Sequence, residues 1–459
     1  MNTIINILLF LLILGILVFV HELGHFLAAK KSGVFIHEFS IGMGPLVKQI
    51  TGKDGIKYSI RALPLGGYVQ MAGEIYEDDD TKKIPKDKFM CNKKWYQRLI
   101  ILCAGVFNNF LLAIFILFII GFAYGATSLK PVIYDVVPNK PMAKAGVVAG
   151  DEIIAIDGKK TKTWDRAQLL LLLKNKNDEY EIKIKHEDGT TDTYTVSPLK
   201  EMTKFIDPDQ DGVYSIATTI DIDKDNDNKK DYQVSAILKE NNVYIDHYGN
   251  EYIDENNDWI YTLSNEDVKG PEEDLPKKTF EIDVDTDEDG KKDTTIEAEY
   301  DEDGNIVQVG ATEGREFGIQ IKSEELKGNK FINAIKFAFG KFLSVVDQMY
   351  LTLGGLFTGK ISINQLSGPV GIYTVVGETR TAGFASVIFL MAYLSINLGV
   401  MNILPIPALD GGHVLFLIIE MITRKKVNAK VEAITTTIFF VLLIALMIYI
   451  TIHDIITLF

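Results

Sequence analysis

The stretch His21-Glu22-Leu23-Gly24-His25 decides how the rest of this chain is interpreted, because it places three ionisable side chains in an apolar segment. Residues 4–20 are all apolar or glycine except Asn6. Ionisable groups in a membrane helix are costly and therefore mark functional sites. Histidines four residues apart share one helix face and can bind one metal ion, with Glu22 left to act on water at the metal. A chance match or an inactive remnant is the alternative.

Four segments are long and apolar enough to cross a bilayer, which takes about 20 residues each. They are Ile4–Ala29, Leu99–Phe122, Phe384–Leu404 and Ile434–Ile452. The first segment lacks a basic start and a small-residue cleavage site, so we interpret it as an uncleaved membrane helix. The loop 30–98 carries 13 Lys and Arg, and the loop after the third segment carries four more. This bias places both loops in the cytoplasm and both termini outside.

The charge of the chain is concentrated in one stretch. Residues 201–315 hold 33 Asp and Glu against 11 Lys and Arg, whereas the whole chain has a net charge of −15. An acidic soluble insert is therefore joined to a mildly basic, apolar body. Because no basic stripe accompanies aromatic residues, nucleic-acid binding is not expected. Cys91 and Cys103 fit neither a metal-ligand spacing nor a disulfide framework.

The first cytoplasmic loop contains two glycine-punctuated runs with β propensity, residues 40–44 and 58–69. They predict a hairpin that lies against or dips into the membrane, where protein or a cavity must satisfy its backbone. A plain cytoplasmic hairpin is the alternative. Residues 77–94 are charged and are interpreted as a solvated connector.

A catalytic zinc site needs a third protein ligand and an open position. The stretch 402–412 ends the third apolar segment, where Pro405 and Pro407 break the helix at membrane depth and Asp410 follows. Irregular backbone at that depth makes sense only beside protein or a cavity. Asp410 is therefore the candidate third ligand. His413 is an alternative ligand, although a satisfied polar residue near the start of the fourth helix is the preferred interpretation.

A compact soluble module is predicted after the second apolar segment. From Pro138 to Gly158 the sequence indicates a short helix, a Gly-Asp turn, an apolar strand and an Asp-Gly turn. Its Ala-Gly, Gly-Asp and Ile-Asp-Gly core closely resembles the bacterial PDZ domain, which binds extended peptide by strand addition.

The acidic insert repeats an aspartate spacing that is typical of calcium turns, in which alternate carboxylates converge on a hard cation. The repeat consists of Asp223, Asp225, Asp227 and Asp231 and of Asp285, Asp287, Asp289 and Asp293. Val234 and Ile296 occupy position twelve, where an EF-hand needs Glu, so short calcium turns between strands are favoured instead. A solvated acidic spacer is the alternative. The Tyr-rich and Val/Ile/Thr-rich runs argue for a folded β region.

Taken together, the two zinc motifs, the β-loop, the PDZ module and residues 366–372 resemble the site-2 protease family, in particular its bacterial members with an extracytoplasmic PDZ domain. The resemblance implies that His21, His25 and Asp410 bind zinc and that Glu22 is the catalytic base. It further implies that Asn402 holds the substrate or the developing oxyanion. By the same resemblance, Gly42, Gly44 and Gly67 belong to a membrane-embedded β-loop that receives substrate as an added strand.

One departure from the family pattern lies in the second apolar segment. Gly105-Val106 stands where the family has Gly-Pro, followed by Asn109 at the family's Asn position and an extra Asn108 before it. Altered helix packing with intact chemistry is expected. The acidic insert also lies outside the family pattern, so its role cannot be carried over.

The predicted fold is a multi-pass α-helical membrane protein with four transmembrane helices, a membrane-associated β-loop, an α+β PDZ domain and an acidic, mostly β insert. The predicted divisions are 1–30 for the first helix with its zinc motif, 31–98 for the β-loop region, 99–124 for the second helix, 128–200 for the PDZ domain, 201–316 for the insert, 317–383 for a return segment with an amphipathic helix, 384–412 for the third helix with the second zinc motif, and 413–459 for a cytoplasmic turn and the fourth helix.

The predicted function is zinc-dependent intramembrane proteolysis in the bacterial plasma membrane. By family resemblance, the substrate is a single-pass transmembrane protein such as an anti-sigma factor, and the extracytoplasmic PDZ domain acts as a size filter or docking site. The expected cofactors are one catalytic Zn²⁺ and, in the insert, Ca²⁺. The lipid bilayer is the expected surroundings and no stable protein partner is predicted. A non-catalytic scaffold that binds peptides or calcium is the main alternative; four spans without an inverted repeat count against a transporter.

Overall fold

The computed structural model describes residues 2–458 apart from short internal segments. These segments are 74–83, 137–139, 174–178, 202–203, 208–212, 224–231, 241–242, 248–249, 254–259, 265–279, 286–293, 301–305, 309–313, 322–323 and 364–365. Six of the eight aspartates predicted to bind calcium therefore lie outside the described residues: Asp225, Asp227, Asp231, Asp287, Asp289 and Asp293.

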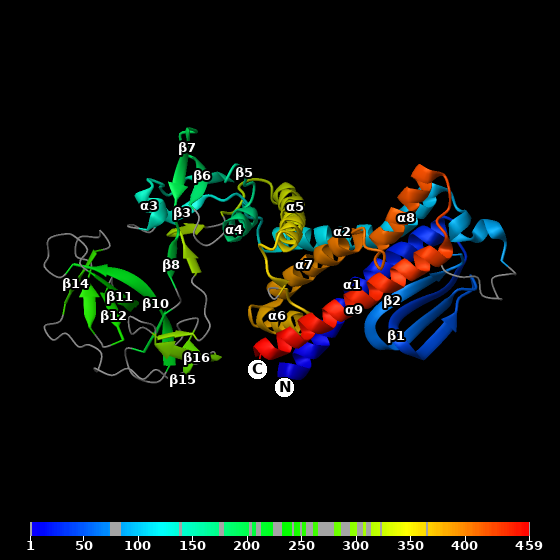
Figure 1. Ribbon diagram of the computed structural model, residues 1–459, viewed down its shortest axis with the longest axis horizontal. Coiled ribbons are helices and arrows are strands. Elements are labelled where there is room, and N and C mark those ends of the chain that lie inside the picture. The colour runs from blue at the N-terminus through cyan, green and yellow to red at the C-terminus, as the bar shows by residue number, and fades with distance from the viewer. Residues whose placement is uncertain are drawn as a thin grey trace. The chain divides into compact units, whose positions relative to one another are not determined.

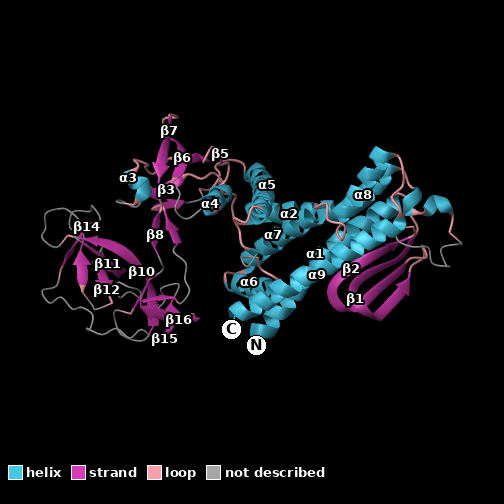
Figure 2. Ribbon diagram, viewed as in Figure 1, coloured by secondary structure: helices cyan, strands magenta, loops and turns pink. Residues whose placement is uncertain are grey.

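The chain divides into two compact units, each of which is described by itself. The first unit comprises Met1–Lys130, Lys162–Lys174 and Ser323–Phe459, and the second comprises Pro131–Thr161 and Asn175–Lys322. The first unit contains all the long helices, whereas the second is built mainly from strands (Figures 1 and 2).

The first unit has a long helix at each of the four predicted membrane spans. The helices are α1 (Asn2–Lys31), α2 (Trp95–Ala123), α4 (Trp164–Leu172), α5 (Lys330–Phe357), α6 (Pro369–Thr381), α7 (Phe384–Ile403), α8 (Asp410–Thr423) and α9 (Ala429–Leu458). Four of them are long and apolar enough to cross a membrane, over Ile4–Lys31, Trp95–Ala123, Phe384–Ile403 and Lys430–Ile456. Two 3₁₀ turns, η2 (Lys86–Lys88) and η3 (Met90–Asn92), lie in the charged connector.

Helix α2 is the centre of this unit, because α1, α5, α7 and α8 all pack against it. Its buried Ala113, Ile116 and Leu117 form one core with side chains of α5 and α7. Two further helices were not among the predicted elements. Helix α6 begins at Pro369, and α8 begins at Asp410 directly after the proline-broken stretch.

Strands β1 (Ile36–Thr51) and β2 (Lys57–Met71) form the predicted antiparallel hairpin, and β2 packs against α1 (Figure 2). Each strand bends, so that Ser40 pairs with Tyr68 on one side and with Ser59 on the other. The bends fall at glycines with φ near +83° to +86°, Gly42, Gly44 and Gly66, a conformation that other residues rarely adopt. The sheet is consequently four segments wide, and segments 67–71 and 46–51 are its edges.

One arginine joins these segments. The Arg61 guanidinium donates to the Gly44 carbonyl oxygen at 2.9 Å, to the Glu38 carboxylate at 3.0 Å and to the Tyr68 hydroxyl at 2.6 Å. Burial raises the pKa of Glu38, but hydrogen bonds from Ser59, Arg61 and Tyr68 outweigh it, and the net pKa lies below its ordinary value.

The second unit contains a four-stranded sheet of order β5-β4-β6-β7 beside the short helix α3 (Pro141–Lys144). The strands are β4 (Glu152–Ile156), β5 (Lys159–Lys160), β6 (Tyr180–Lys185) and β7 (Thr191–Val196). Strand β3 (Ile133–Val136) pairs antiparallel with β19 (Ile319–Ile321). The PDZ-like module therefore takes its last strand from the return segment, which lies beyond the predicted limit of residue 200.

The acidic insert is connected to the module by a ribbon of β8 (Leu199–Glu201) and β18 (Gly314–Glu316). Its own strands are β9 (Lys204–Ile206), β10 (Val213–Ile222), β11 (Tyr232–Glu240), β12 (Val243–Asp246), β13 (Glu251–Ile253), β14 (Ile260–Leu263), β15 (Phe280–Asp285), β16 (Thr294–Tyr300) and β17 (Ile306–Gln308). They form two closed rings of five strands that share β10: β10 to β14 make one, and β9, β10 and β15 to β17 make the other.

Each ring has its own apolar core, which supports the interpretation of the insert as folded. One core is built around Ile222 and Tyr261, and the other around Phe205 and Val284. Closure of a sheet pairs every strand on both sides and so removes its edges.

Replacing Arg61 by methionine is expected to loosen the β1–β2 sheet, because the four segments lose their shared donor. Amide hydrogen exchange should accelerate over residues 36–71 and stay unchanged in α2 and α7. Lys48→Met, a substitution of an exposed lysine on the same sheet, is the matched control. Equal exchange in wild type and Arg61→Met would contradict the role of Arg61.

The same sheet should lose protection in acid. The pKa of Glu38 is depressed in the folded state. The stability that its carboxylate contributes is therefore fully present above the pKa that Glu38 has in the unfolded chain. That contribution is lost as the pH falls through the folded pKa. Glu38→Gln is expected to remove this acid dependence, which exchange measured over a pH series would detect.

Candidate metal centre

Helix α1 and the start of α8 bring three predicted ligands together. His21 and His25 lie one turn apart on α1, and their Nε2 atoms are 3.2 Å apart. The Oδ2 atom of Asp410 lies 3.1 Å from Nε2 of His21 and 3.3 Å from Nε2 of His25. Both histidines are buried. Among the described residues, these three side chains form a group whose ligand atoms could hold one metal ion.

The surroundings of His25 determine which of its nitrogens is free. Its Nδ1 lies 2.8 Å from the Ile101 carbonyl oxygen, which can only accept a hydrogen bond. The proton of the neutral imidazole is therefore on Nδ1, which leaves its Nε2 bare toward the other two ligand atoms. A backbone carbonyl that fixes the tautomer of a histidine ligand is a common feature of metal sites.

This arrangement fits a cation. A bare Nε2 and a carboxylate oxygen face each other at 3.3 Å, and the Asp410 Oδ2 atom is buried without a hydrogen-bond partner in the described part of the chain. Leaving such an acceptor unsatisfied costs about 1–3 kcal/mol. Two imidazole nitrogens and one carboxylate oxygen are the donor set of many catalytic zinc sites.

Two glycines allow α1 and α2 to approach closely at the centre. A Cβ at Gly24 would collide with the Ala104 carbonyl group, and a Cβ at Gly105 would collide with both imidazole rings. Helix α2 continues unbroken through Val106, the residue that stands where the family has proline. Of the pair Gly105-Val106, the glycine is therefore the residue on which the approach of α2 to the two histidines depends.

The remaining predicted site residues surround the same centre. Glu22 is half-buried on α1, and its Cγ lies 3.2 Å from the position of a Cβ at Gly67 on β2. The Asn402 Nδ2 atom lies 3.5 Å from Nε2 of His21. The structure therefore brings the candidate base, the candidate oxyanion donor and one edge of the β1–β2 sheet together, while Gly42 and Gly44 form bends in that sheet.

His413 is not part of the metal group among the described residues. It lies on α8 and not at the start of the fourth membrane helix, and its Nδ1 is 3.1 Å from a carboxylate oxygen of Glu432 on α9. The interpretation of His413 as a satisfied polar residue is confirmed.

A family model for peptidase family M50 matches residues 9–446 of this chain. This protein belongs to peptidase family M50. It is therefore a metalloendopeptidase, and the resemblance to site-2 proteases is confirmed.

Several named proteins are similar to this M50 peptidase over nearly its whole length. A protein of Clostridium acetobutylicum, named as a candidate zinc metalloprotease, is 30% identical over 98% of this chain and 97% of its own. The regulator of sigma-E protease RseP of Escherichia coli is 29% identical over 95% of both chains. The regulator of sigma E protease of Haemophilus influenzae is 28% identical over 97% of both.

The two described aspartates of the calcium prediction occupy equivalent places in the insert. Asp223 and Asp285 are both buried, and each follows the last residue that its strand pairs within its own hairpin. Ile222 pairs with Tyr232 in one hairpin and Val284 pairs with Thr294 in the other, so the two connections have the same length. The sequence repeat thus corresponds to a repeat in structure.

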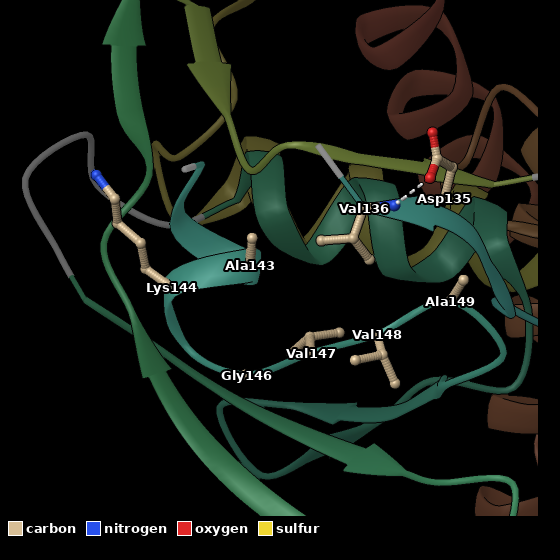
Figure 3. Close-up of a pocket in the computed structure, with 8 residues that line it drawn as sticks. All are labelled: Asp135, Val136, Ala143, Lys144, Gly146, Val147, Val148 and Ala149. Carbon is tan, nitrogen blue, oxygen red and sulfur yellow. Dashed lines mark hydrogen bonds between the residues drawn. The ribbon is translucent and has the colours of Figure 1, made fainter. Parts of the chain in front are cut away.

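A cavity of about 400 Å³ lies in the PDZ-like module between the end of β3, α3 and the following turn (Figure 3). Val136, Val147 and Val148 contribute apolar walls, and Asp135 and Lys144 lie at its two ends (Figure 3). None of the residues singled out as catalytic or ligand-binding in the sequence lines this cavity.

Two groups that contact the histidines had no role assigned to them from the sequence. The Ile101 carbonyl is a backbone group and leaves no signal in a sequence. Asn109 lies 3.2 Å from Nδ1 of His21. Asn109 is a polar residue in the middle of an apolar membrane segment. Because burying such a residue is costly, its position in the sequence marks it as a functional candidate.

Gly105→Ala is expected to weaken zinc binding at least about tenfold, because the added methyl group displaces both imidazoles from their positions. Chelator competition on the purified protein would measure the loss. Gly354→Ala is the matched control, since a Cβ there meets nothing within 4 Å. Unchanged zinc affinity in Gly105→Ala would contradict the placement of α2 against the ligands.

Proposed function

We propose that this M50 peptidase is a zinc-dependent intramembrane endopeptidase that cleaves transmembrane segments of single-pass membrane proteins in regulated intramembrane proteolysis. The observation that carries the proposal is the convergence of Asp410, at the start of α8, with His21 and His25, which lie on a helix of membrane-spanning length. Relatives whose names include zinc metalloprotease support zinc as the metal.

Zinc held by these three residues would supply a Lewis acid that polarises a carbonyl group and makes water more acidic. Glu22 accepts the proton of the attacking water and later delivers it to the leaving amine. The amide of Asn402, beside His21, donates a hydrogen bond to the oxygen on which negative charge develops. The helices packed around the two histidines keep bulk water away from both ligands.

A transmembrane substrate must unwind before hydrolysis, because a helix keeps its carbonyl groups in internal hydrogen bonds. Segment 67–71 is an edge of the β1–β2 sheet, and Gly67 lies beside Glu22. A substrate that adds to this edge as a strand would present its backbone to the centre. The absence of a side chain on Gly67 leaves room for that approach.

Two relatives are named as regulators of sigma E, which favours an anti-sigma factor as the substrate of this protein. The PDZ-like module acts as a size filter or docking site for a substrate already shortened outside the membrane. The excess of basic residues in the loop 30–98 orients this module and both termini away from the cytoplasm of a bacterial cell.

Glu22→Gln is expected to lower cleavage of a model transmembrane substrate by about 10²–10⁴-fold, because the amide cannot accept the proton of water. The purified proteins would be compared in liposomes, with zinc content measured on the same samples. Zinc content should equal that of wild type, since Glu22 is not in the ligand group.

The comparison also separates the protease from a non-catalytic scaffold. Zinc binding with cleavage in wild type alone supports the protease. Equal cleavage in both proteins assigns proton transfer to another group and overturns the role of Glu22. Absence of both zinc and cleavage in wild type leaves the scaffold, whose activity would then reside in the PDZ-like module and the insert.

We propose further that the acidic insert binds calcium at its two equivalent connections. The buried Asp223 and Asp285 support this, because each belongs to a series of alternate aspartates at the end of a strand. Calcium would rigidify the insert and set how the PDZ-like module controls access.

The double variant Asp223→Asn, Asp285→Asn is expected to lose calcium binding, because each site loses one charged oxygen ligand. Isothermal titration of the full chain in detergent should give a dissociation constant of about 10⁻⁴–10⁻³ M for wild type, the range of extracellular modules. Asp188→Asn in the β6–β7 turn is the control. No heat of binding in wild type would end the calcium proposal and leave the protease proposal untouched.

A further inference from the structure

Asn109 is a fully buried side chain in α2 that faces His21 across the crossing of the two helices. Its Nδ2 atom lies 3.2 Å from Nδ1 of His21, and its Oδ1 atom is buried without a donor in the described part of the chain. The backbone carbonyl of Asn109 is held by the Ser395 hydroxyl at 2.8 Å. The amide group therefore stands against the imidazole with one half of its hydrogen-bonding capacity unused.

Two proton arrangements are possible at this contact. With the proton on Nε2, His21 accepts at Nδ1 from the Asn109 amide as it stands, and its Nε2 lies 3.1 Å from Asp410 Oδ2. With the proton on Nδ1, two donors would face each other until the amide turns over. The turned amide places Oδ1 against Nδ1–H, so the oxygen gains a donor while Nδ2 takes the former place of the oxygen.

Only the second arrangement leaves Nε2 bare for a metal, because a ligating histidine is neutral and binds through its unprotonated nitrogen. His25 differs here, since a backbone carbonyl cannot turn over and holds it in one tautomer. A carboxamide can serve either state, because it offers a donor and an acceptor on the same planar group.

We propose that Asn109 is a positioning residue that selects the tautomer of His21: its amide donates to Nδ1 without metal and, turned over, accepts from Nδ1–H when Nε2 binds zinc. This inference rests on the proposed zinc function. It goes beyond that function because it names the side chain of α2 whose hydrogen bond to His21 changes when the centre binds zinc.

Three variants of the full chain test the assignment by zinc affinity, measured by chelator competition. Asn109→Leu keeps the size but removes both hydrogen-bonding groups, and it should weaken zinc binding about 10–100-fold. Asn109→Asp keeps an acceptor for Nδ1–H and should stay within a few-fold of wild type. Asn108→Leu is the matched control, because the neighbouring Asn108 donates to the Val20 carbonyl and not to a histidine.

The order of the two Asn109 variants separates positioning from packing. If Asn109 only fills space, the apolar leucine is tolerated better than a buried carboxylate, so Asn109→Leu binds zinc at least as well as Asn109→Asp. That order would overturn the proposal, as would equal weakening in both. Thermal unfolding of the zinc-free variants, recorded in parallel, measures the packing cost separately from zinc affinity.

Histidine ¹⁵N spectra of the wild-type chain give a second readout. His21 should carry its proton on Nε2 without zinc and on Nδ1 with zinc, whereas His25 should keep the proton on Nδ1 throughout. One unchanged His21 tautomer in both states would overturn the proposed switch. Absence of zinc binding in wild type would instead overturn the proposed function itself, so the two failures are distinguishable.

Discussion

The close crossing of α1 and α2 is the contact on which the centre depends. At membrane depth no solvent is available to satisfy an imidazole, so each ring nitrogen that does not face the metal must find a partner in protein. Helix α2 supplies both partners, the Ile101 carbonyl for His25 and the Asn109 amide for His21. It reaches them because Gly24 and Gly105 remove the side chains that would hold the helices apart.

The third ligand poses a different problem, because Asp410 follows a broken helix. Between α7 and α8 the chain satisfies its own backbone in tight turns, with Ile406 donating to Leu404 and Leu409 donating to Ile406. Gly411 and Gly412 complete this arrangement. A Cβ at either position would collide with carbonyl groups of the same stretch. The two glycines let the chain fold back on itself, so irregular backbone is tolerated at the point where a carboxylate is needed.

These contacts explain which parts of the centre could be predicted. His21, Glu22, His25 and Asp410 were predictable because polar residues are rare in apolar helices and because helical spacing fixes which of them share a face. The Ile101 carbonyl was not, since a backbone group has no sequence signal. Asn109 stands out as a polar residue in an apolar segment, but its contact with His21 depends on packing between distant segments.

The fold, too, could be predicted where it follows from local sequence patterns and not where it depends on contacts between distant segments. The four spans follow from local hydropathy, and the β1–β2 hairpin follows from its glycines and β-prone runs. The pairing of β3 with β19 joins segments on opposite sides of the insert, and the two rings depend on β10 pairing in both. Such long-range register is not encoded in any one stretch.

The sheets also indicate where an extended substrate can be held. In the described part of the insert, each strand of the two rings is paired on both sides, so the rings offer no edge for strand addition. The β1–β2 sheet is open, and its 67–71 edge includes Gly67 beside Glu22. An unwound segment held by strand addition would therefore pair with the sheet next to the metal centre and not with the rings of the insert.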